Sequence, residues 1–452
     1  MAVINIEKLS ETMNNHRLDA EFYQPQYFID FSKGRWEPIK KFLDICQYGI
    51  SQAMIEEPRG YPIFRMDDIK DCFLLDDEVK YVEISKQTFR QFKLEVNDVL
   101  FNRVNAEEFV GRTGIFKLKG NYVFASYLIR LRVKPNSEIL PDYLNIFLNT
   151  KYGKKQIRKF ARRAVNQANV NAEELKNFKI YVLPRKFQEE ISQLVDTAWA
   201  KIELSKSLYN QAENLLLEEL GLKDFKPKYE LSYTANLSQA FNTHRLDAEY
   251  FQPAYDKVVE KIKEYPNGCA RLLEYVENIK PDFDPTKYPD KTFSYVELAD
   301  IDASIGVIHS VSRIKGEEAP SRARRILKKN DVIVSSVEGS LEKVALVDEE
   351  HEDCLASTGF FQFRTTKILP QVLLVLSKSI VLQAQLKKEC AGTILTAVPT
   401  KSLKKILIPI ISDEVQQKIA KLVQQSHEAR RKAKELLEEA KRKVEKAIEK
   451  NK

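Results

Sequence analysis

The chain has 452 residues, which is enough for two or three domains, and 43% of them are hydrophobic, which excludes a disordered protein. Its 72 Lys and Arg outnumber 65 Asp and Glu, so the net charge is +7. This mild excess excludes neither a nucleic-acid partner nor an ordinary cytosolic protein, so the position of the charges has to decide between them.

The first recognisable element is a ten-residue segment that occurs twice. His16-Arg-Leu-Asp-Ala-Glu-Phe-Tyr-Gln-Pro25 returns as His244-Arg-Leu-Asp-Ala-Glu-Tyr-Phe-Gln-Pro253, 228 residues later, with eight identical positions and a Phe–Tyr exchange at the other two. Leu9, Ser10 and Tyr27 recur at the same offset. Because this offset is close to half of the chain, we predict two copies of one unit joined end to end.

Between its repeated ends, each copy has the pattern of short strands and helices. The β-rich runs are residues 61–64, 99–101, 114–118 and 127–133 in the first copy, and 332–334 and 360–363 in the second. A helix that begins at a proline follows in each copy, at residues 141–148 and 370–376. Weak matches such as Asn97-Asp-Val-Leu100 with Asn330-Asp-Val-Ile333 indicate a shared fold whose surface has changed. We therefore predict a compact domain of about 150 residues in each middle.

Each copy ends in a long amphipathic helix. Pro184 leads into Gln188 and Ile191, and the same Gln–Ile pair recurs 228 residues later, after Pro409. Apolar residues then return every three or four positions, which is typical of the narrow seam of a coiled-coil helix. We expect the two helices to pair antiparallel through Ile191, Leu194, Ala198, Leu208, Ala212, Ile419, Leu422, Ala429, Leu436, Ala440 and Val444.

These elements predict an α+β fold class: two α/β-mixed domains in a tandem pseudo-repeat, separated by two long antiparallel coiled-coil helices. The expected boundaries are 1–186 for the first domain, 187–222 for the central helix, 223–411 for the second domain and 412–452 for the distal helix.

A cluster of cations stands out in the first copy. From Lys151 to Arg163 there are seven Lys or Arg residues and no acid. On a continuous helix, Lys151, Lys155, Arg158 and Arg162 would share one face. A solvated helix face normally mixes both signs of charge, so an all-cation face favours contact with phosphates.

A second basic cluster, Ser321-Arg-Ala-Arg-Arg325, lies in the other copy, and arginines can bond guanine edges or phosphates. Polar segments near both clusters carry Asn and Gln, which can pair with adenine. Loop and helix capping explain these amides equally well, and Asn171 with Glu174 has the pattern of a helix cap. On the first interpretation, the predicted DNA contacts are Asn102, Arg103, Asn105, Lys155, Arg158, Arg162, Asn166, Gln167, Ser321, Arg322, Arg324, Arg325, Ser335 and Ser336.

A search for catalytic patterns finds no phosphate-binding loop, no Gly-x-Gly-x-x-Gly and no Asn-Pro-Pro-aromatic or Asp-Pro-Pro-aromatic tetrapeptide. His351 and Cys354 have metal-ligand spacing but no second pair, so we predict no metal site. Pro141-Asp142 with Glu174-Leu-Lys176 matches a nuclease-like pattern, but that site needs strands where these residues predict helix starts. We therefore predict no catalytic residue in this chain.

The compartment follows from the cysteines and from the apolar segments. The five cysteines are an odd number and widely scattered, so no disulfide framework is predicted and the compartment is expected to be reducing. The N-terminal residues lack the pattern of a signal peptide, and the apolar stretch 368–382 is too short for a membrane span. We expect a cytoplasmic protein with no membrane contact.

Taken together, these features resemble the specificity (S) subunit of type I restriction-modification systems, and the resemblance covers essentially the whole chain. The segments 17–25 and 245–253 look like the one that opens each half in a branch of that family. The Pro, Gln and Ile at the start of each long helix are similar to the family's helix start. Pro320-Ser-Arg-Ala-Arg-Arg325, Asn330-Asp-Val-Ile333 and Ser357-Thr-Gly-Phe360 look like pieces of its target recognition domains.

The resemblance implies two target recognition domains, each reading one half of a bipartite double-stranded DNA site, with the paired helices as a ruler between them. It also implies two methyltransferase (M) subunits docked on the helices, which can recruit motor-endonuclease (R) subunits. S-adenosylmethionine, ATP and Mg²⁺ would belong to those partners, and this chain would hold no cofactor.

Two other functions stay open at this point. A tandem scaffold that binds protein would need large exposed apolar patches. A nuclease or methyltransferase in its own right would act on DNA as an isolated chain, and its activity would depend on Glu174.

Overall fold

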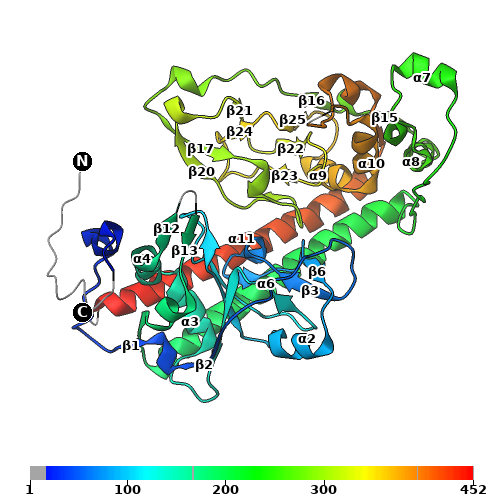
Figure 1. Cartoon of the computed structure of the whole chain (residues 1–452). Coiled ribbons are helices and arrows are strands. Elements are labelled where there is room, and N and C mark those ends of the chain that lie inside the picture. The colour runs from blue at the N-terminus through cyan, green and yellow to red at the C-terminus, as the bar shows by residue number, and fades with distance from the viewer. Residues whose placement is uncertain (1–16, 165–166, 394, 451–452) are drawn as a thin grey trace. The chain divides into compact units, whose positions relative to one another are not determined.

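The computed structural model describes residues 17–164, 167–393 and 395–450. They form two compact units (Figure 1). Unit 1 contains the chain up to Ile202 together with the residues from Arg431 onward, and unit 2 is the single segment Glu203–Arg430. Both units combine sheets with helices, so the predicted α+β class is confirmed.

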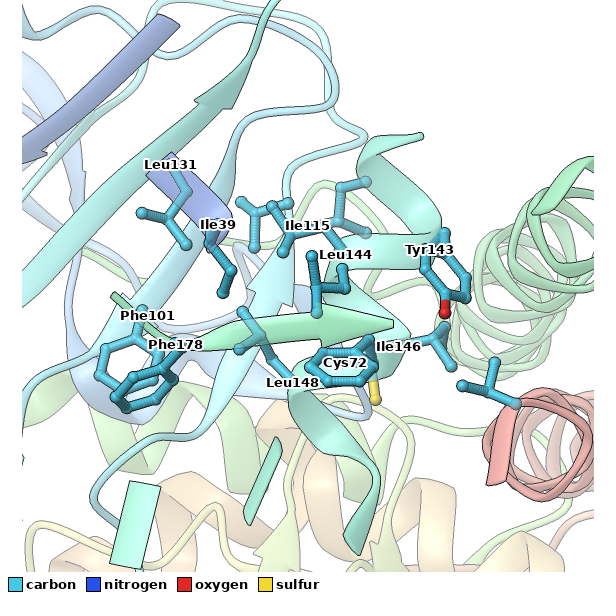
Figure 2. Packing of buried hydrophobic residues seen from close by; sticks show 14 of the residues in the cluster. Ile39, Cys72, Phe101, Ile115, Leu131, Tyr143, Leu144, Ile146, Leu148 and Phe178 are labelled. Carbon is cyan, nitrogen blue, oxygen red and sulfur yellow. The ribbon is translucent and has the colours of Figure 1, made fainter. Parts of the chain in front are cut away.

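The main sheet of unit 1 has six strands, and α3 (Pro141–Asn149) packs against it. The strand order is β2 (Leu43–Tyr48), β11 (Leu128–Val133), β7 (Val99–Asn102), β9 (Thr113–Ile115), β5 (Phe73–Leu74) and β4 (Ile69–Lys70). Helix α3 begins at the expected proline, and Figure 2 shows its Leu144, Ile146 and Leu148 within the core. The buried Tyr143 hydroxyl donates a hydrogen bond to the Tyr181 carbonyl at 2.7 Å, so α3 is also tied to the strand before the long helix.

Smaller elements surround this sheet. They are β10 (Val123–Phe124), β3 (Tyr61–Phe64) and β6 (Lys80–Val82) beside α2 (Lys86–Phe92); β12 (Arg162–Ala164), β13 (Gln167–Asn169) and β8 (Val104–Asn105); β1 (Trp36–Pro38) with β14 (Lys179–Tyr181); and the helices α4 (Lys151–Phe160) and α5 (Ala172–Lys176).

Unit 2 repeats the central part of this arrangement around α9 (Pro370–Lys378) and α10 (Ile380–Glu389). Its sheets are β16 (Val276–Asn278), β25 (Phe360–Thr365), β22 (Val332–Ser335) and β23 (Val344–Leu346); β20 (Ser312–Lys315), β17 (Thr292–Val296), β24 (Leu355–Ser357) and β21 (Ala323–Ile326); β18 (Ile301–Asp302) with β19 (Val307–Ile308); and β15 (Cys269–Arg271) with β26 (Leu407–Pro409). Two helices precede them, α7 (Leu237–Thr243) and α8 (Pro253–Lys263).

The repeated Asn-Asp-Val segment forms the same turn in both units. Asn97 and Asn330 have φ angles of 74° and 71°, in the left-handed region that Asn tolerates better than most residues. The next residue is a buried aspartate, and its carboxylate forms a two-pronged ion pair with an arginine on a neighbouring strand. Asp98 accepts from Arg132 at 2.7 Å through both oxygens, and Asp331 accepts from Arg364 at 2.9 and 3.0 Å. The sequence match therefore reflects a buried structural pair.

The repeated glutamine at the start of each long helix ties that helix to its unit. Gln188 accepts a hydrogen bond from the backbone N–H of Leu140 at 2.9 Å, and Gln416 accepts one from Leu369 at 3.0 Å. Leu140 and Leu369 are the N-caps of α3 and α9, so each glutamine satisfies a backbone donor at the start of a helix.

The long helices are α6 (Arg185–Glu219) and α11 (Asp413–Lys450) (Figure 1). In unit 1, Ile191, Val195, Ala198 and Ile202 of α6 share a core with Ala433, Leu437, Ala440, Val444 and Ile448 of α11. In unit 2, Tyr209, Ala212, Leu216 and Leu220 share a core with Ile419 and Val423. The early part of one helix thus packs with the late part of the other, and the predicted antiparallel pairing is confirmed.

The predicted seam residues differ in how deeply they lie in this pairing. Ile191, Ala198, Ala212, Ile419, Ala429, Ala440 and Val444 are buried, and Leu194, Leu422 and Leu436 pack at the margin of the core. Leu208 is only half-buried, and the neighbouring Tyr209 takes the core position, since a seam that passes through Ile202 and Ser205 reaches residue 209 after four more positions.

None of the helices in the described part of the chain has the length and apolar character that a membrane span requires.

Candidate nucleic-acid interface

Helix α4 carries a basic depression in unit 1. Its inner face buries Tyr152, Gly153, Gln156 and Ile157, which leaves its cations on the outer face. Gln156 fixes the helix to β14, because its side chain accepts from Lys179 N–H at 2.6 Å and donates to Lys179 O at 2.8 Å. The depression has a volume of about 390 Å³ and is lined by Gln26, Tyr27, Glu107, Lys151, Lys154, Lys155 and Arg158.

The cations around the depression are not equally engaged. Lys151 forms an ion pair with Glu449, and Arg158 lies 3.8 Å from Glu107. Within the described residues, no carboxylate forms an ion pair with Lys154 or Lys155. Two ammonium groups therefore face a concave, solvent-open surface with their charge uncompensated, which is the electrostatic arrangement that attracts a phosphate.

Glu107 is held beside the depression by Arg163. Arg163 donates to the Glu107 carboxylate at 2.7 Å and to the Tyr27 hydroxyl at 3.3 Å. This hydrogen bond lowers the pKa of Glu107, so the carboxylate stays charged and neutralises Arg163. The two lysines, and not Arg163, are left to bind an anion.

Arg162 does not lie on the cationic helix face that the sequence predicts. Helix α4 ends at Phe160 because Ala161 is extended, and Arg162 pairs with Asn169 in the β12–β13 hairpin. Its guanidinium donates to Glu174 at 2.9 Å and is 63% exposed. Gln167 is exposed on the same hairpin, whereas Asn166 lies outside the described residues.

The other predicted contacts of unit 1 make intramolecular bonds. Asn102 is fully buried in β7 and donates to Phe109 O at 3.2 Å. Arg103 is partly buried, donates to Ser126 O at 2.9 Å and stacks over the Tyr48 ring at 4.8 Å. Asn105 accepts from Ala106 N–H at 2.8 Å. DNA contact by these side chains stays a prediction, and their bonds give them a structural role.

In unit 2 the basic cluster divides into an exposed part and a buried part. Ser321 and Arg322 are exposed just before β21, and Arg324 is partly exposed and pairs with Asp284 at 2.8 Å. Arg325 is buried and donates to Ile279 O, and this burial lowers the pKa of its guanidinium to about 10. Alternation along the strand therefore points only some of these cations outward.

Ser335 is the last residue of β22 and Ser336 follows it, and both are largely buried. Ser335 accepts a hydrogen bond from Val337 N–H at 3.1 Å, and Ser336 donates to Gly359 O at 2.9 Å. These bonds shape the loop after β22, and a role in DNA contact stays a prediction.

Lys151, Lys154 and Tyr27 also line the depression, although they are not among the DNA contacts predicted from the sequence. The two lysines belong to the same cationic cluster as Lys155, and Tyr27 recurs as Tyr255. Both signals were present in the sequence, but only the folded chain shows which cations share a surface.

The nuclease-like residues are engaged in structural contacts. Asp142 is buried at the start of α3, where burial raises the pKa of its carboxyl group, and it pairs with Lys117 at 2.8 Å. Glu174 accepts from both Arg17 and Arg162 and caps α5 with Asn171, as the sequence predicts. In the described ranges, no three His, Cys, Asp or Glu side chains gather as they would around a metal ion.

Comparisons with known proteins agree with this architecture. The family model "Type I restriction modification DNA specificity domain" matches residues 35–214 and 286–442. The "Putative type I restriction enzyme MjaX specificity subunit" of Methanocaldococcus jannaschii is 24% identical, with 94% of this chain and 96% of that protein covered. The type I restriction enzyme EcoKI specificity subunit of Escherichia coli is 25% identical over 50% of this chain and 48% of its own length.

Among solved structures, an HsdS subunit from Thermoanaerobacter tengcongensis is 34% identical over 34% of this chain and 41% of that chain, with a TM-score of 0.31.

Proposed function

The chain belongs to the type I restriction-modification DNA specificity family, and from this premise we propose that it is a non-catalytic subunit that reads a bipartite site in double-stranded DNA. Methyltransferase subunits would dock on it and perform the chemistry. The observation that carries the proposal is the depression beside α4, where Lys154 and Lys155 present uncompensated charge.

The proposed DNA contact in unit 1 combines this depression with the neighbouring hairpin. Lysines bind the phosphate backbone irrespective of sequence and fix the protein on the duplex. The exposed Gln167 and Arg162 of the β12–β13 hairpin carry side chains that can bond base edges. We propose that the lysines anchor the duplex and that the hairpin supplies the sequence discrimination.

The proposal of two half-sites is supported by two units that share buried structural contacts but differ in their exposed surfaces. The buried Asp–Arg pair and the glutamine anchor occur in both units. By contrast, the strand pair β20–β17 and the exposed Arg322 belong to unit 2, while the α4 cations and the β12–β13 hairpin belong to unit 1. A common frame with unlike surfaces favours the reading of two different short sequences.

The long helices would set the spacing between the half-sites and offer a surface for methyltransferase subunits. A helix of 35 residues is about 50 Å long, whereas half-sites one turn apart on a duplex are separated by about 34 Å. Linked readers also gain affinity through effective concentration. S-adenosylmethionine, ATP and Mg²⁺ would bind the methyltransferase and motor-endonuclease subunits.

Selection from a random duplex library tests the proposal. The full chain, co-purified with a methyltransferase subunit of the same system, should enrich two short motifs at a fixed spacing. Exchanging one unit's surface residues for those of a relative should change one motif only. If the intact complex enriches no sequence at low salt, DNA recognition is wrong.

A further inference from the structure

We propose that helix α2 of unit 1, under the DNA-reading function proposed above, enters the major groove and reads bases there in addition to the β12–β13 hairpin. Arg90 would bond a guanine, and Gln87 and Gln91 would each bond an adenine. These three residues would be further specificity-determining residues of the chain, and none of them is among the DNA contacts predicted from the sequence.

The outer face of α2 is polar and contains no acid. Lys86, Gln87, Arg90 and Gln91 are exposed, and with 3.6 residues per turn they lie within an arc of about 140°. Within the described residues, none of these four side chains makes a hydrogen bond or an ion pair. Residues 84–94 contain three cations and no Asp or Glu. A solvated helix face normally mixes both signs of charge, so this face favours an anionic partner.

The inner face of α2 is fixed by aromatic packing. Phe89 stacks on Tyr61 of β3, with the ring centroids 4.1 Å apart and the ring planes at 8°. Phe92 lies against Phe124 of β10, with the ring centroids 6.2 Å apart. Because these contacts hold the helix on its sheet, the outer side chains project from an ordered backbone, which reduces the entropy that binding would cost.

Both ends of α2 are held as well. At the start, the Ser85 hydroxyl accepts a hydrogen bond from Thr88 N–H at 3.0 Å. At the end, the buried guanidinium of Arg130 donates to the carbonyls of Gln91 at 3.1 Å and Lys93 at 2.8 Å. A seven-residue helix is marginal by itself, so these bonds explain how α2 stays folded at the edge of unit 1 (Figure 1). Arg130 is therefore a positioning residue for α2.

The size and composition of α2 match the major groove. This groove is about 12 Å wide and admits an α-helix, whose diameter with side chains is about 10–12 Å. Arginine can bond O6 and N7 of guanine together, and glutamine can bond N6 and N7 of adenine together. Gln87 and Gln91 are four positions apart with Arg90 between them, so all three project from one side within about one helical turn.

Helix α2 and the β12–β13 hairpin flank the same end of the main sheet. On one side, Arg103 lies over the Tyr48 ring and donates to Asn169 of the hairpin at 3.5 Å. On the other side, Gln47 accepts from Arg130, which caps α2. Gln47 and Tyr48 are consecutive residues at the end of β2, and their side chains point to opposite faces of the sheet. A duplex lying across this end of the sheet can therefore contact both elements.

Unit 2 carries a different basic segment at the equivalent place. Strand β3 pairs with β10 and β6 as β17 pairs with β24 and β20, parallel with the first partner and antiparallel with the second. Helix α2 lies between β6 and β7, and Ser321–Arg325, with the exposed Arg322, lies between β20 and β22. Neither segment contains an acid. Two unlike basic segments at one place in a shared frame are expected where each unit reads its own half-site.

The base preference of the intact complex tests the role of α2. The chain bound to a methyltransferase subunit of the same system selects duplexes from a random library, and the affinity for the selected duplex is compared with that for single-base changes. Arg90→Ala should remove the preference for guanine at one position of one half-motif, lowering discrimination there by roughly 5- to 150-fold. Gln87→Ala with Gln91→Ala should do the same at adenines of that half-motif, whereas Arg322→Ala should alter only the other half-motif.

Lys119→Ala is the matched control. Lys119 is an exposed cation of unit 1 outside α2, and no carboxylate in the described ranges pairs with it. Its replacement should leave both half-motifs unchanged. Because all the substituted side chains are exposed, the thermal midpoint of every variant should equal that of the wild type.

Other results would overturn the proposal. An unchanged half-motif in both α2 variants would show that α2 reads no base. A uniform loss on all duplexes, with a salt slope reduced by about 0.9, would make Arg90 a phosphate anchor. A lowered thermal midpoint would assign the outer face to the fold, and dissociation of the methyltransferase subunit would assign it to that subunit. If the wild-type complex itself selects no sequence, the proposed function is wrong and the role of α2 with it.

Discussion

Replacing Lys154 and Lys155 together by Gln should weaken the salt dependence of DNA binding without changing the sequence that is selected. Both ammonium groups line the depression beside α4 and have no carboxylate partner among the described residues. Each phosphate contact contributes about 0.9 to the slope of log K against log salt concentration, so losing two contacts should reduce that slope by about 1.8. Between about 50 and 200 mM salt, this is a difference of about twelvefold in how far affinity falls.

Fluorescence anisotropy with the selected duplex, measured for the intact complex at several salt concentrations, gives this slope directly. Lys176→Gln is the matched control, because Lys176 already pairs with Glu173 at 2.8 Å in the same unit, and its slope should equal that of the wild type. An unchanged slope in the double variant would refute the assignment of the depression to phosphate. A relaxed sequence preference would mean that the lysines read bases.

Three further predictions concern the frame. Asp98→Ala should destabilise unit 1 by about 3–5 kcal/mol in urea unfolding, because it leaves the buried Arg132 and the neighbouring Arg130 without their shared carboxylate. Glu414→Ala is the control: it removes a surface ion pair with Lys418 and should cost under about 1 kcal/mol. Ser205→Ala combined with Ser426→Ala should change stability by less than about 1 kcal/mol, because it removes both hydroxyls of a buried pair together and leaves only the Ser205 carbonyl, which lies within helix α6, without the Ser426 donor. By comparison, Ile191→Ala should cost about 2–5 kcal/mol. A large loss in the serine double variant would show that the polar pair determines how the helices align. Burial lowers the pKa of His427, whose ring contacts Ile305 O at 2.9 Å, so just below pH 6.5 the unfolded chain binds more protons than the folded chain. The free energy of unfolding should therefore fall as the pH drops through that range and level off below the folded-state pKa. His427→Gln should flatten this part of the stability profile, and an unaltered profile would exclude His427 as its source.

The sequence predicted the parts of the fold that depend on periodicity. The 228-residue offset, the two long helices and the prolines that begin α3 and α9 were all visible, because repeats and helical seams leave regular patterns. Helix phase was harder to predict, since Leu208 and Tyr209 are both apolar and only the packing of the partner helix distinguishes them.

The candidate interface was less predictable than the fold. Basic and amide residues were identified by type, but type does not reveal burial. Arg325 and Asn102 are buried inside their units. Arg162 lies beyond the end of α4, because the chain becomes extended at Ala161 and residues 162–164 pair with residues 167–169. Each outcome depends on contacts between segments that are far apart in the sequence, which local patterns do not contain.

The way the chain is divided between its units has a consequence for synthesis on the ribosome. Unit 2 is one uninterrupted segment, so all of its contacts can form soon after Arg430 has emerged. Unit 1 needs Ala433, Leu437, Ala440, Val444 and Ile448 to cover Ile191 and its neighbours on α6, and these residues are translated more than two hundred positions later. During that interval one apolar seam of the nascent chain has no partner within its own unit. Unit 1, although its sheet is synthesised first, is therefore completed last. A chain that stalls before residue 431 leaves the apolar seam of α6 exposed and prone to aggregation.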